Sequence, residues 1–172
     1  HAVIAEQFGW KYSDYGIILT TALIVYAVSV FLNGPITDKI GGKKSLVIGA
    51  IGTAIFNFLF GLTSIFLLTP SVIQNKQIIT PAVLNFGVTS SMVISFMALV
   101  WAFNHYFQSF GALAIVKINA AWIKLEERGK FAGWFGFLIH FGRVLVFLFC
   151  PLILLYLPWQ YVFWIPSILI IS

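Results

Sequence analysis

Residues 34–44, with the sequence Gly-Pro-Ile-Thr-Asp-Lys-Ile-Gly-Gly-Lys-Lys, form a short basic connection between two long apolar runs. Gly41 and Gly42 permit a tight turn there, because glycine adopts backbone conformations closed to other residues. Gly34 predicts a close helix contact, the role that small residues have in membrane bundles. Asp38 can lie against a helix N-terminus, where negative charge is favoured. The basic members, which suit an anionic membrane surface, are Lys39, Lys43 and Lys44.

The composition on both sides of this connection indicates a membrane protein. Of the 172 residues, 60% are apolar, 17% aromatic and only 9% charged. A soluble domain carries about 25% charged residues, so the composition argues against a soluble enzyme, a nucleic-acid-binding protein and a disordered chain. A helix that spans a bilayer needs about 20 mostly apolar residues. We therefore predict an all-α, polytopic membrane helix bundle with spans at approximately 15–33, 45–69, 90–122, 131–157 and 159–172, the last one truncated.

The segments outside these spans predict the partial helix at the start of the chain and the loops between the spans. His1–Phe8 is expected to be the last turns of a preceding helix, and the chain an internal piece of a longer protein. Pro70–Thr89 is expected to be an external loop. The run 90–122 is long for one straight span, so we expect either a kink at Gly111 or an extension beyond the bilayer. Because Cys150 is the only cysteine, no disulfide can form within the chain.

The basic residues predict the orientation in the membrane. The chain has ten Lys and Arg against five Asp and Glu, a net charge of +5. Residues 34–44 hold three of the basic residues and residues 123–130 hold another three, whereas the opposite side holds only Lys11 and Lys76. The positive-inside rule therefore predicts that the connections 34–44 and 123–130 are cytoplasmic.

The pattern Gly-x-x-x-Asp-basic-x-Gly-Gly-basic-basic of residues 34–44 resembles the signature loop between the second and third helices of the major facilitator superfamily. This resemblance implies that the chain runs from the end of helix 1 to the start of helix 6 in an N-terminal six-helix half. The absent C-terminal half would be its partner, and docking of the loop on that half would stabilise the outward-facing state. Glu127 and Arg128, with Glu126, are expected either to join a charge network with Asp38 at this gate or to be solvated.

A second stretch narrows the resemblance. Residues 101–111, Trp-Ala-Phe-Asn-His-Tyr-Phe-Gln-Ser-Phe-Gly, together with Glu-Arg-Gly at 127–129, resemble the organophosphate:phosphate antiporter family, and Tyr26 matches its second helix. The chain departs from the family at His105, where the family has glycine, and at Val30, where several members have lysine. The resemblance implies exchange of phosphorylated metabolites for phosphate by alternating access, in a multi-pass protein of the bacterial inner membrane.

Ionisable groups inside a span are costly and are therefore candidates for function. His140 and Arg143 share one face of the fifth helix, on a stripe that begins with three glycines expected to allow close packing, Gly129, Gly133 and Gly136. We predict that both bind the small anionic substrate, for which phosphate is the candidate; the alternative is that Arg143 pairs with the absent half. Four further residues are candidates for substrate binding: Tyr26, Asn104, Gln108 and Lys117. The alternative roles are packing for Tyr26, interhelical hydrogen bonding for Asn104 and Gln108, and snorkelling for Lys117.

All five acidic residues fall outside the predicted spans. Proton-coupled carriers often have a carboxylate inside the membrane, so anion exchange is favoured. The sequence predicts no catalytic residue, no metal site, no cofactor and no nucleic-acid partner; the lipid bilayer is the expected environment. Two other functions remain open, which are a sugar-phosphate sensor of the same family and a facilitator carrier for another organic anion. A purely structural membrane subunit is a weaker alternative.

Overall fold

The computed structural model describes residues 11–66, 72–74, 77–79 and 90–171, and confirms an all-α membrane bundle. The α-helices of these described residues are α2 (Tyr12–Ile40), α3 (Gly42–Phe66), α4 (Ser90–Trp122), α5 (Arg128–Tyr156) and α6 (Tyr161–Ile171). Within these residues α2, α3 and the segment containing α5 are long and apolar enough to cross a membrane. The predicted helix end at His1–Phe8 lies outside the described residues.

The predicted external loop Pro70–Thr89 contains a short hairpin, which the sequence analysis did not foresee. Strand β1 (Val72–Gln74) pairs antiparallel with β2 (Gln77–Ile79), so that Val72 lies opposite Ile79. Both strands carry β-branched residues, which favour extended backbone. The rest of this loop lies outside the described residues.

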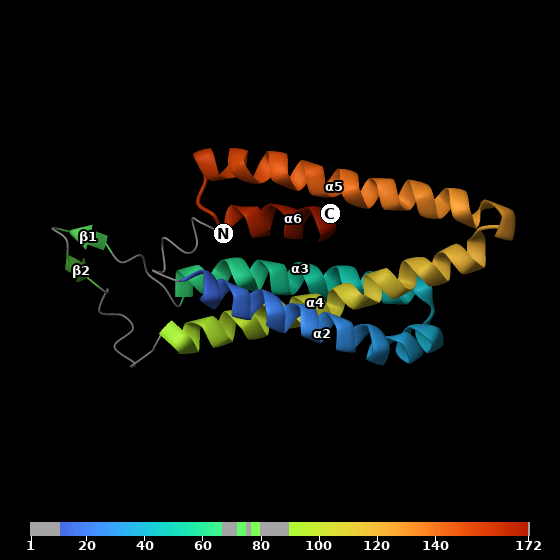
Figure 1. Cartoon of the computed structure of the whole chain (residues 1–172), viewed down its shortest axis with the longest axis horizontal. Coiled ribbons are helices and arrows are strands. Elements are labelled where there is room, and N and C mark those ends of the chain that lie inside the picture. The colour runs from blue at the N-terminus through green and yellow to red at the C-terminus, as the bar shows by residue number, and fades with distance from the viewer. Residues whose placement is uncertain (1–10, 67–71, 75–76, 80–89, 172) are drawn as a thin grey trace.

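Helix α4 is the centre of the bundle and packs against both α2 and α3 (Figure 1). It is one helix of 33 residues, or about 50 Å at 1.5 Å per residue. It therefore exceeds the roughly 30 Å hydrocarbon core. Backbones of α3 and α4 approach closely, because a Cβ at Gly49 would lie 3.0 Å from the Phe107 carbonyl oxygen, and one at Gly52 would overlap the Phe107 ring.

Residues 34–40 are helical, which corrects the prediction of a loop over the whole of 34–44. Helix α2 continues through Pro35 to Ile40, and the connection to α3 is Gly41 alone, with φ 87°. This φ lies in the region that favours glycine. The helix persists because its buried face, which includes Asn33 and Thr37, packs on α4. One internal proline is tolerated in membrane helices, where neighbours satisfy the freed backbone groups.

The predicted close contact at Gly34 is not present among the described residues, where a Cβ on Gly34 would have no neighbour within 4 Å. The reason is that the adjacent Asn33 turns its side chain to α4 and leaves Gly34 beside that face. The expected close packing of the glycine stripe on α5 is also absent from the described part of the chain, since added Cβ atoms there meet nothing within 4 Å. A groove separates that stripe from α4, as described below.

The two connections rich in basic residues lie at the same end of the bundle (Figure 1). This end, called the basic end below, holds Gly41 between α2 and α3, and a 3₁₀ turn at Leu125–Glu127 between α4 and α5. Its exposed lysines are Lys39, Lys43, Lys44, Lys124 and Lys130. The opposite end carries the hairpin and an aromatic cluster from α3, α4 and the start of α6, formed by Phe60, Trp101, Trp159 and Phe163.

Candidate functional site

Four polar side chains lie at the middle of three helices. Tyr26 is the central residue of α2, His105 lies within one residue of the centre of α4, and Arg143 lies within one residue of the centre of α5. His140 precedes Arg143 by three residues on the same helix face. Each of these helices is longer than the hydrocarbon core is thick, and we expect these four residues, called the central polar set, near mid-depth.

His105 is the member of this set that the sequence analysis noted only as a departure from the family pattern. Its Nδ1 lies 3.1 Å from the Trp101 carbonyl oxygen. A carbonyl oxygen only accepts, so Nδ1 carries the proton and Nε2 is the nitrogen left to bind something else. The ring meets Tyr26 edge to face at 6.3 Å and Trp101 at 5.3 Å. A histidine at the centre of a span was the sequence signal that could have identified it.

His140 and Arg143 occupy an open face of α5. No residue of α5 is buried by other described parts of the chain, and both side chains are exposed. His140 Nδ1 donates to the Gly136 carbonyl oxygen at 3.0 Å, which again leaves Nε2 free. Within the described ranges the Arg143 guanidinium has no hydrogen bond or ion pair. Five unused donors at the centre of a span require a polar partner, because bare hydrocarbon cannot solvate them.

A groove of about 570 Å³ separates α4 from α5. Residues three and four apart lie on one helix face. Continuing the lining face of α5 from Ile139 therefore leads to Arg143, and continuing that of α4 from Gln108 leads to His105. Both continuations run away from the basic end, because the two helices are antiparallel. The lining residues are Gln108, Gly111, Ala112, Ile115, Val116 and Asn119 of α4, with Phe131, Ala132, Phe135, Gly136 and Ile139 of α5.

Asn104 and Gln108 have different environments although they are four residues apart. Asn104 is only 1% exposed and its Nδ2 donates to the Thr53 carbonyl oxygen of α3 at 2.9 Å. Gln108 is exposed, lines the groove, and donates from Nε2 to Asn104 Oδ1 at 2.6 Å. Asn104 therefore links two helices, while the Gln108 amide oxygen is the polar group of this pair available to the groove.

Lys117 lies near the basic end and contacts Asp38 rather than the central polar set. Its Nζ donates to Asp38 Oδ1 at 2.8 Å and to the Asp38 carbonyl oxygen at 2.8 Å. A third donation, at 3.3 Å, goes to the Thr37 carbonyl oxygen. A cation over the last carbonyls of a helix complements their partial negative charge. Lys117 thus fastens the end of α2 to α4.

The predicted charge network of Asp38 with Glu126, Glu127 and Arg128 is wrong for the described residues. The ion pair of Asp38 there is with Lys117. Arg128 instead donates to the carbonyl oxygens of Ala120, at 2.7 Å, and Ile123, at 3.1 Å, at the end of its preceding helix. The reason is local, since the guanidinium reaches the unsatisfied carbonyls at the C-terminus of α4 without crossing to α2.

A buried polar contact between α2 and α4 escaped the sequence analysis. Asn33, 0% exposed, donates from Nδ2 to Ser109 Oγ at 2.8 Å, and Ser109 donates to the Tyr106 carbonyl oxygen at 2.7 Å. Polar groups buried in a membrane bundle hold helices together through such bonds. Asn33 directly precedes Gly34, and the family pattern drew attention to the glycine instead. The contact joins α2 and α4 midway between the central polar set and the Asp38–Lys117 pair.

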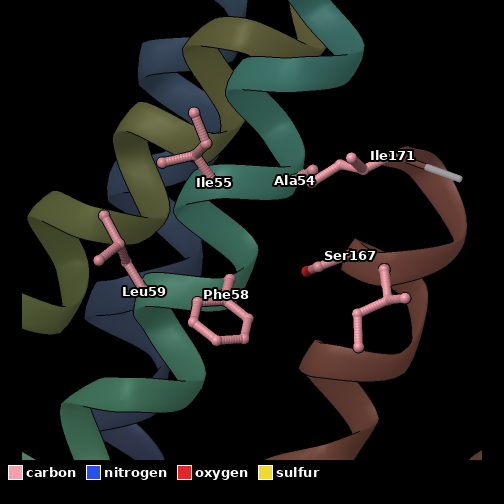
Figure 2. Close-up of a pocket in the computed structure, with 7 residues that line it drawn as sticks. Ala54, Ile55, Phe58, Leu59, Ser167 and Ile171 are labelled. Atoms are coloured by element: carbon pink, nitrogen blue, oxygen red, sulfur yellow. The ribbon is translucent and has the colours of Figure 1, made fainter.

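A second cavity, of about 330 Å³, lies between α3 and α6 (Figure 2). Ser167 and Ile171 of α6 point toward α3 there (Figure 2), whereas the side chains of Ile55 and Leu59 extend from α3 away from α6. The lining residues are Ala54, Ile55, Phe58 and Leu59 of α3, with Ser167, Ile168 and Ile171 of α6. Its single polar side chain, Ser167, donates its hydroxyl to the Phe163 carbonyl oxygen at 2.7 Å. The walls offer no charge to an anion, so this cavity is not the candidate site. Within the described chain no group of three or more histidine, cysteine or acidic side chains could hold a metal ion.

A known protein family and several known proteins are similar to this chain over most of its length. The model of the Major Facilitator Superfamily matches residues 1–172. The "Membrane sensor protein UhpC" of Salmonella typhimurium is 27% identical over 148 residues, which is 86% of this chain and 27% of that protein. A "Probable hexose phosphate transport protein" of Chlamydia pneumoniae is 26% identical over 169 residues, 98% of this chain and 31% of the relative.

A "Glycerol-3-phosphate transporter" of Bacillus subtilis is 26% identical over 167 residues, 96% of this chain and 32% of the relative. The chain therefore spans about a third or less of the length of these relatives. No solved structure matches the chain significantly. The relatives support the resemblance to sugar-phosphate and glycerol-phosphate carriers that the sequence predicts.

Proposed function

This chain belongs to the major facilitator superfamily, and we propose from that premise that it forms part of a secondary transporter that exchanges phosphorylated metabolites for phosphate by alternating access. The observation that carries the proposal is the central polar set at the midpoints of α2, α4 and α5. Transporters of this architecture bind substrate near the bilayer midplane, between two halves. Four carriers with phosphorylated substrates in their names among the relatives add support.

In this proposal Arg143 is the main anion ligand. A guanidinium binds two phosphate oxygens at once in a planar fork, which a lysine cannot reproduce. His140, one turn away, and the Gln108 amide oxygen serve the phosphate and the hydroxyls of the organic part. Tyr26 closes the site from α2, where its ring already contacts His105. The absent half supplies the opposite wall.

Exchange without proton coupling is the proposed mode. Among the described residues the carboxylates are Asp14, Asp38, Glu126 and Glu127, all at helix ends or connections. No described carboxylate is therefore available at mid-depth to carry a proton across the membrane. In anion exchange, one anion returns for each anion delivered. The positive charge of the binding site is therefore neutralised by a bound anion in both directions of transport.

The gate is proposed to lie at the basic end, on the cytoplasmic side of a bacterial inner membrane. Its sidedness follows from the exposed lysines there under the positive-inside rule, and the bacterial location from the sources of the relatives. The Asn33–Ser109 bond and the Asp38–Lys117 pair would keep α2 and α4 together as one moving unit. Residues 34–44 would then dock on the absent half in one of the two states.

The test is exchange by the full-length protein in proteoliposomes. Vesicles loaded with phosphate are expected to take up labelled phosphate, and then labelled hexose phosphate or glycerol phosphate, with saturation. Vesicles without internal phosphate are expected to take up neither. Uptake that ignores internal phosphate would contradict antiport, and uptake only of carboxylates or sugar acids would establish the other organic-anion carrier instead.

A sensor is the second candidate, because the relatives include the membrane sensor UhpC of Salmonella typhimurium and of Escherichia coli. The central polar set would bind the same anions in both cases. A sensor is expected to bind hexose phosphate in detergent, seen as a raised melting temperature, but to exchange none across vesicles. Binding with rapid exchange would exclude a purely sensory role.

A further inference from the structure

His105 has the features of a ligand-binding side chain rather than of a packing residue. Its Nδ1–H is occupied by the Trp101 carbonyl oxygen, and no hydrogen bond reaches Nε2 from any described residue. The imidazole is half-buried, not sealed. A histidine that only packs would be expected to satisfy both nitrogens, because an unpaired polar atom costs free energy in hydrocarbon.

The ring is also held in one orientation. Tyr26 meets it edge to face from α2, and Trp101 packs on it from one turn earlier in α4. The hydrogen bond to Trp101 fixes which nitrogen is protonated. These three contacts orient the ring and leave Nε2 as the ring nitrogen that can bind a ligand. Fixing a side chain in this way before the ligand arrives is a feature of preorganised binding sites.

His140 provides the matching arrangement on α5, with Nδ1 bonded to its own i−4 carbonyl and Nε2 free. His105 and His140 lie on the faces of α4 and α5 that continue from the two walls of the groove. Both are near the centres of their helices. The two Nε2 atoms without a hydrogen bond from a described residue therefore belong to residues on the helix faces that continue the two groove walls, each near the middle of its helix.

We propose that His105 is a second phosphate-binding residue of this protein, whose unprotonated Nε2 on α4 accepts a hydrogen bond from the hydroxyl of a monoprotonated phosphate group, opposite His140 and Arg143 of α5. The inference rests on the proposed transport function. It adds a ligand at a position where the resembling family has glycine, so this chain would hold the phosphate from both walls of the groove.

The test compares His105→Ala and His105→Gln in the proteoliposome exchange assay. Losing a hydrogen bond to a charged group costs affinity by about tenfold or more. His105→Ala is therefore expected to raise KM for phosphate about tenfold with the maximal rate within twofold. His105→Gln, whose amide oxygen can accept the same hydrogen bond, is expected to recover part of the loss. Phe103→Leu, on the opposite face of α4 at the same depth, is the matched control and should keep its KM.

A chemical readout separates this inference from the transport function. Diethyl pyrocarbonate acylates an unprotonated imidazole nitrogen, and peptide mass spectrometry reports the modification of His105 itself in the wild-type protein. Inorganic phosphate is expected to slow that modification severalfold, whereas chloride at equal ionic strength should not. Unchanged KM in both variants, or equal modification with and without phosphate, would overturn the role of His105. Absence of exchange by the wild type, with His105 still protected by phosphate, would overturn transport alone.

Discussion

Replacing Arg143 with glutamine is expected to lower phosphate exchange by about a hundredfold or more. The guanidinium is the one cation of the described chain at the centre of a helix, and within the described residues it has no partner. In the proposed site it neutralises the phosphate directly. Removing a desolvated charged partner costs roughly 2–5 kcal/mol, and each 1.4 kcal/mol is a factor of ten.

The measurement is the initial rate of labelled phosphate uptake into phosphate-loaded proteoliposomes, at equal amounts of folded protein. Arg143→Lys keeps the charge but loses the planar fork, so it should retain a minor part of the activity. Lys130→Gln, at the exposed start of α5, removes a positive charge from the same helix and is the control. Near-normal exchange by Arg143→Gln would show that Arg143 serves the absent half or the lipid surface rather than the substrate.

Breaking the Asp38–Lys117 pair is expected to slow exchange about five- to twentyfold while leaving phosphate affinity within about twofold. Asp38 is 77% exposed and Lys117 is 34% exposed, so the pair adds little to folding, about 0.2–1 kcal/mol. Its expected effect comes through residues 34–44, because the pair fixes the end of α2 from which that segment is proposed to dock on the absent half in one state only. Contacts made in one state shift a conformational equilibrium by their difference between the two states.

A double-mutant cycle tests the pair. Asp38→Asn and Lys117→Met are each expected to slow exchange without loss of folded protein, and the double variant should be no slower than the worse single variant. Lys124→Gln removes an exposed charge from the same end and is expected to leave exchange unchanged. Full additivity of the two single effects would mean that the 2.8 Å contact has no role in the transport cycle.

The helix bundle was predictable because the length of each apolar run in the sequence shows whether it can span a bilayer. Long apolar runs separated by clustered lysines define helices and their common end, without any knowledge of packing. Pro35 and the glycines around it led to the wrong prediction that the whole of 34–44 is a loop. They favour a break in an isolated helix, but α4 covers the buried face of α2 and moves the break to Gly41. Tertiary contact decided where the helix ended.

The site was predictable only where a polar residue stands out from its surroundings. His140 and Arg143 are conspicuous in an apolar helix, and the structure leaves both exposed. Lys117 was assigned to the substrate because periodicity cannot tell whether a lysine reaches the groove or the end of α2. The contacts of His105 and Asn33 could not be predicted because they are made with residues distant in sequence, Tyr26 and Ser109 respectively.

The most direct test of the central claim is protection of a cysteine placed in the groove. Gly136 lines the groove, and a Cβ added there meets no described atom within 4 Å. Leu138, two residues on, points to the opposite side of α5 and is 57% exposed. Gly136→Cys and Leu138→Cys would be made in a full-length protein whose native cysteines, including Cys150, are replaced by serine.

The rate of maleimide labelling would be measured in membranes with phosphate, with a hexose phosphate, and with chloride at equal ionic strength. We expect both phosphate compounds to slow labelling at position 136 by about fivefold or more and to leave the labelling of position 138 unchanged. Equal labelling of position 136 under all three conditions, in protein that still exchanges phosphate, would contradict an anion site between α4 and α5.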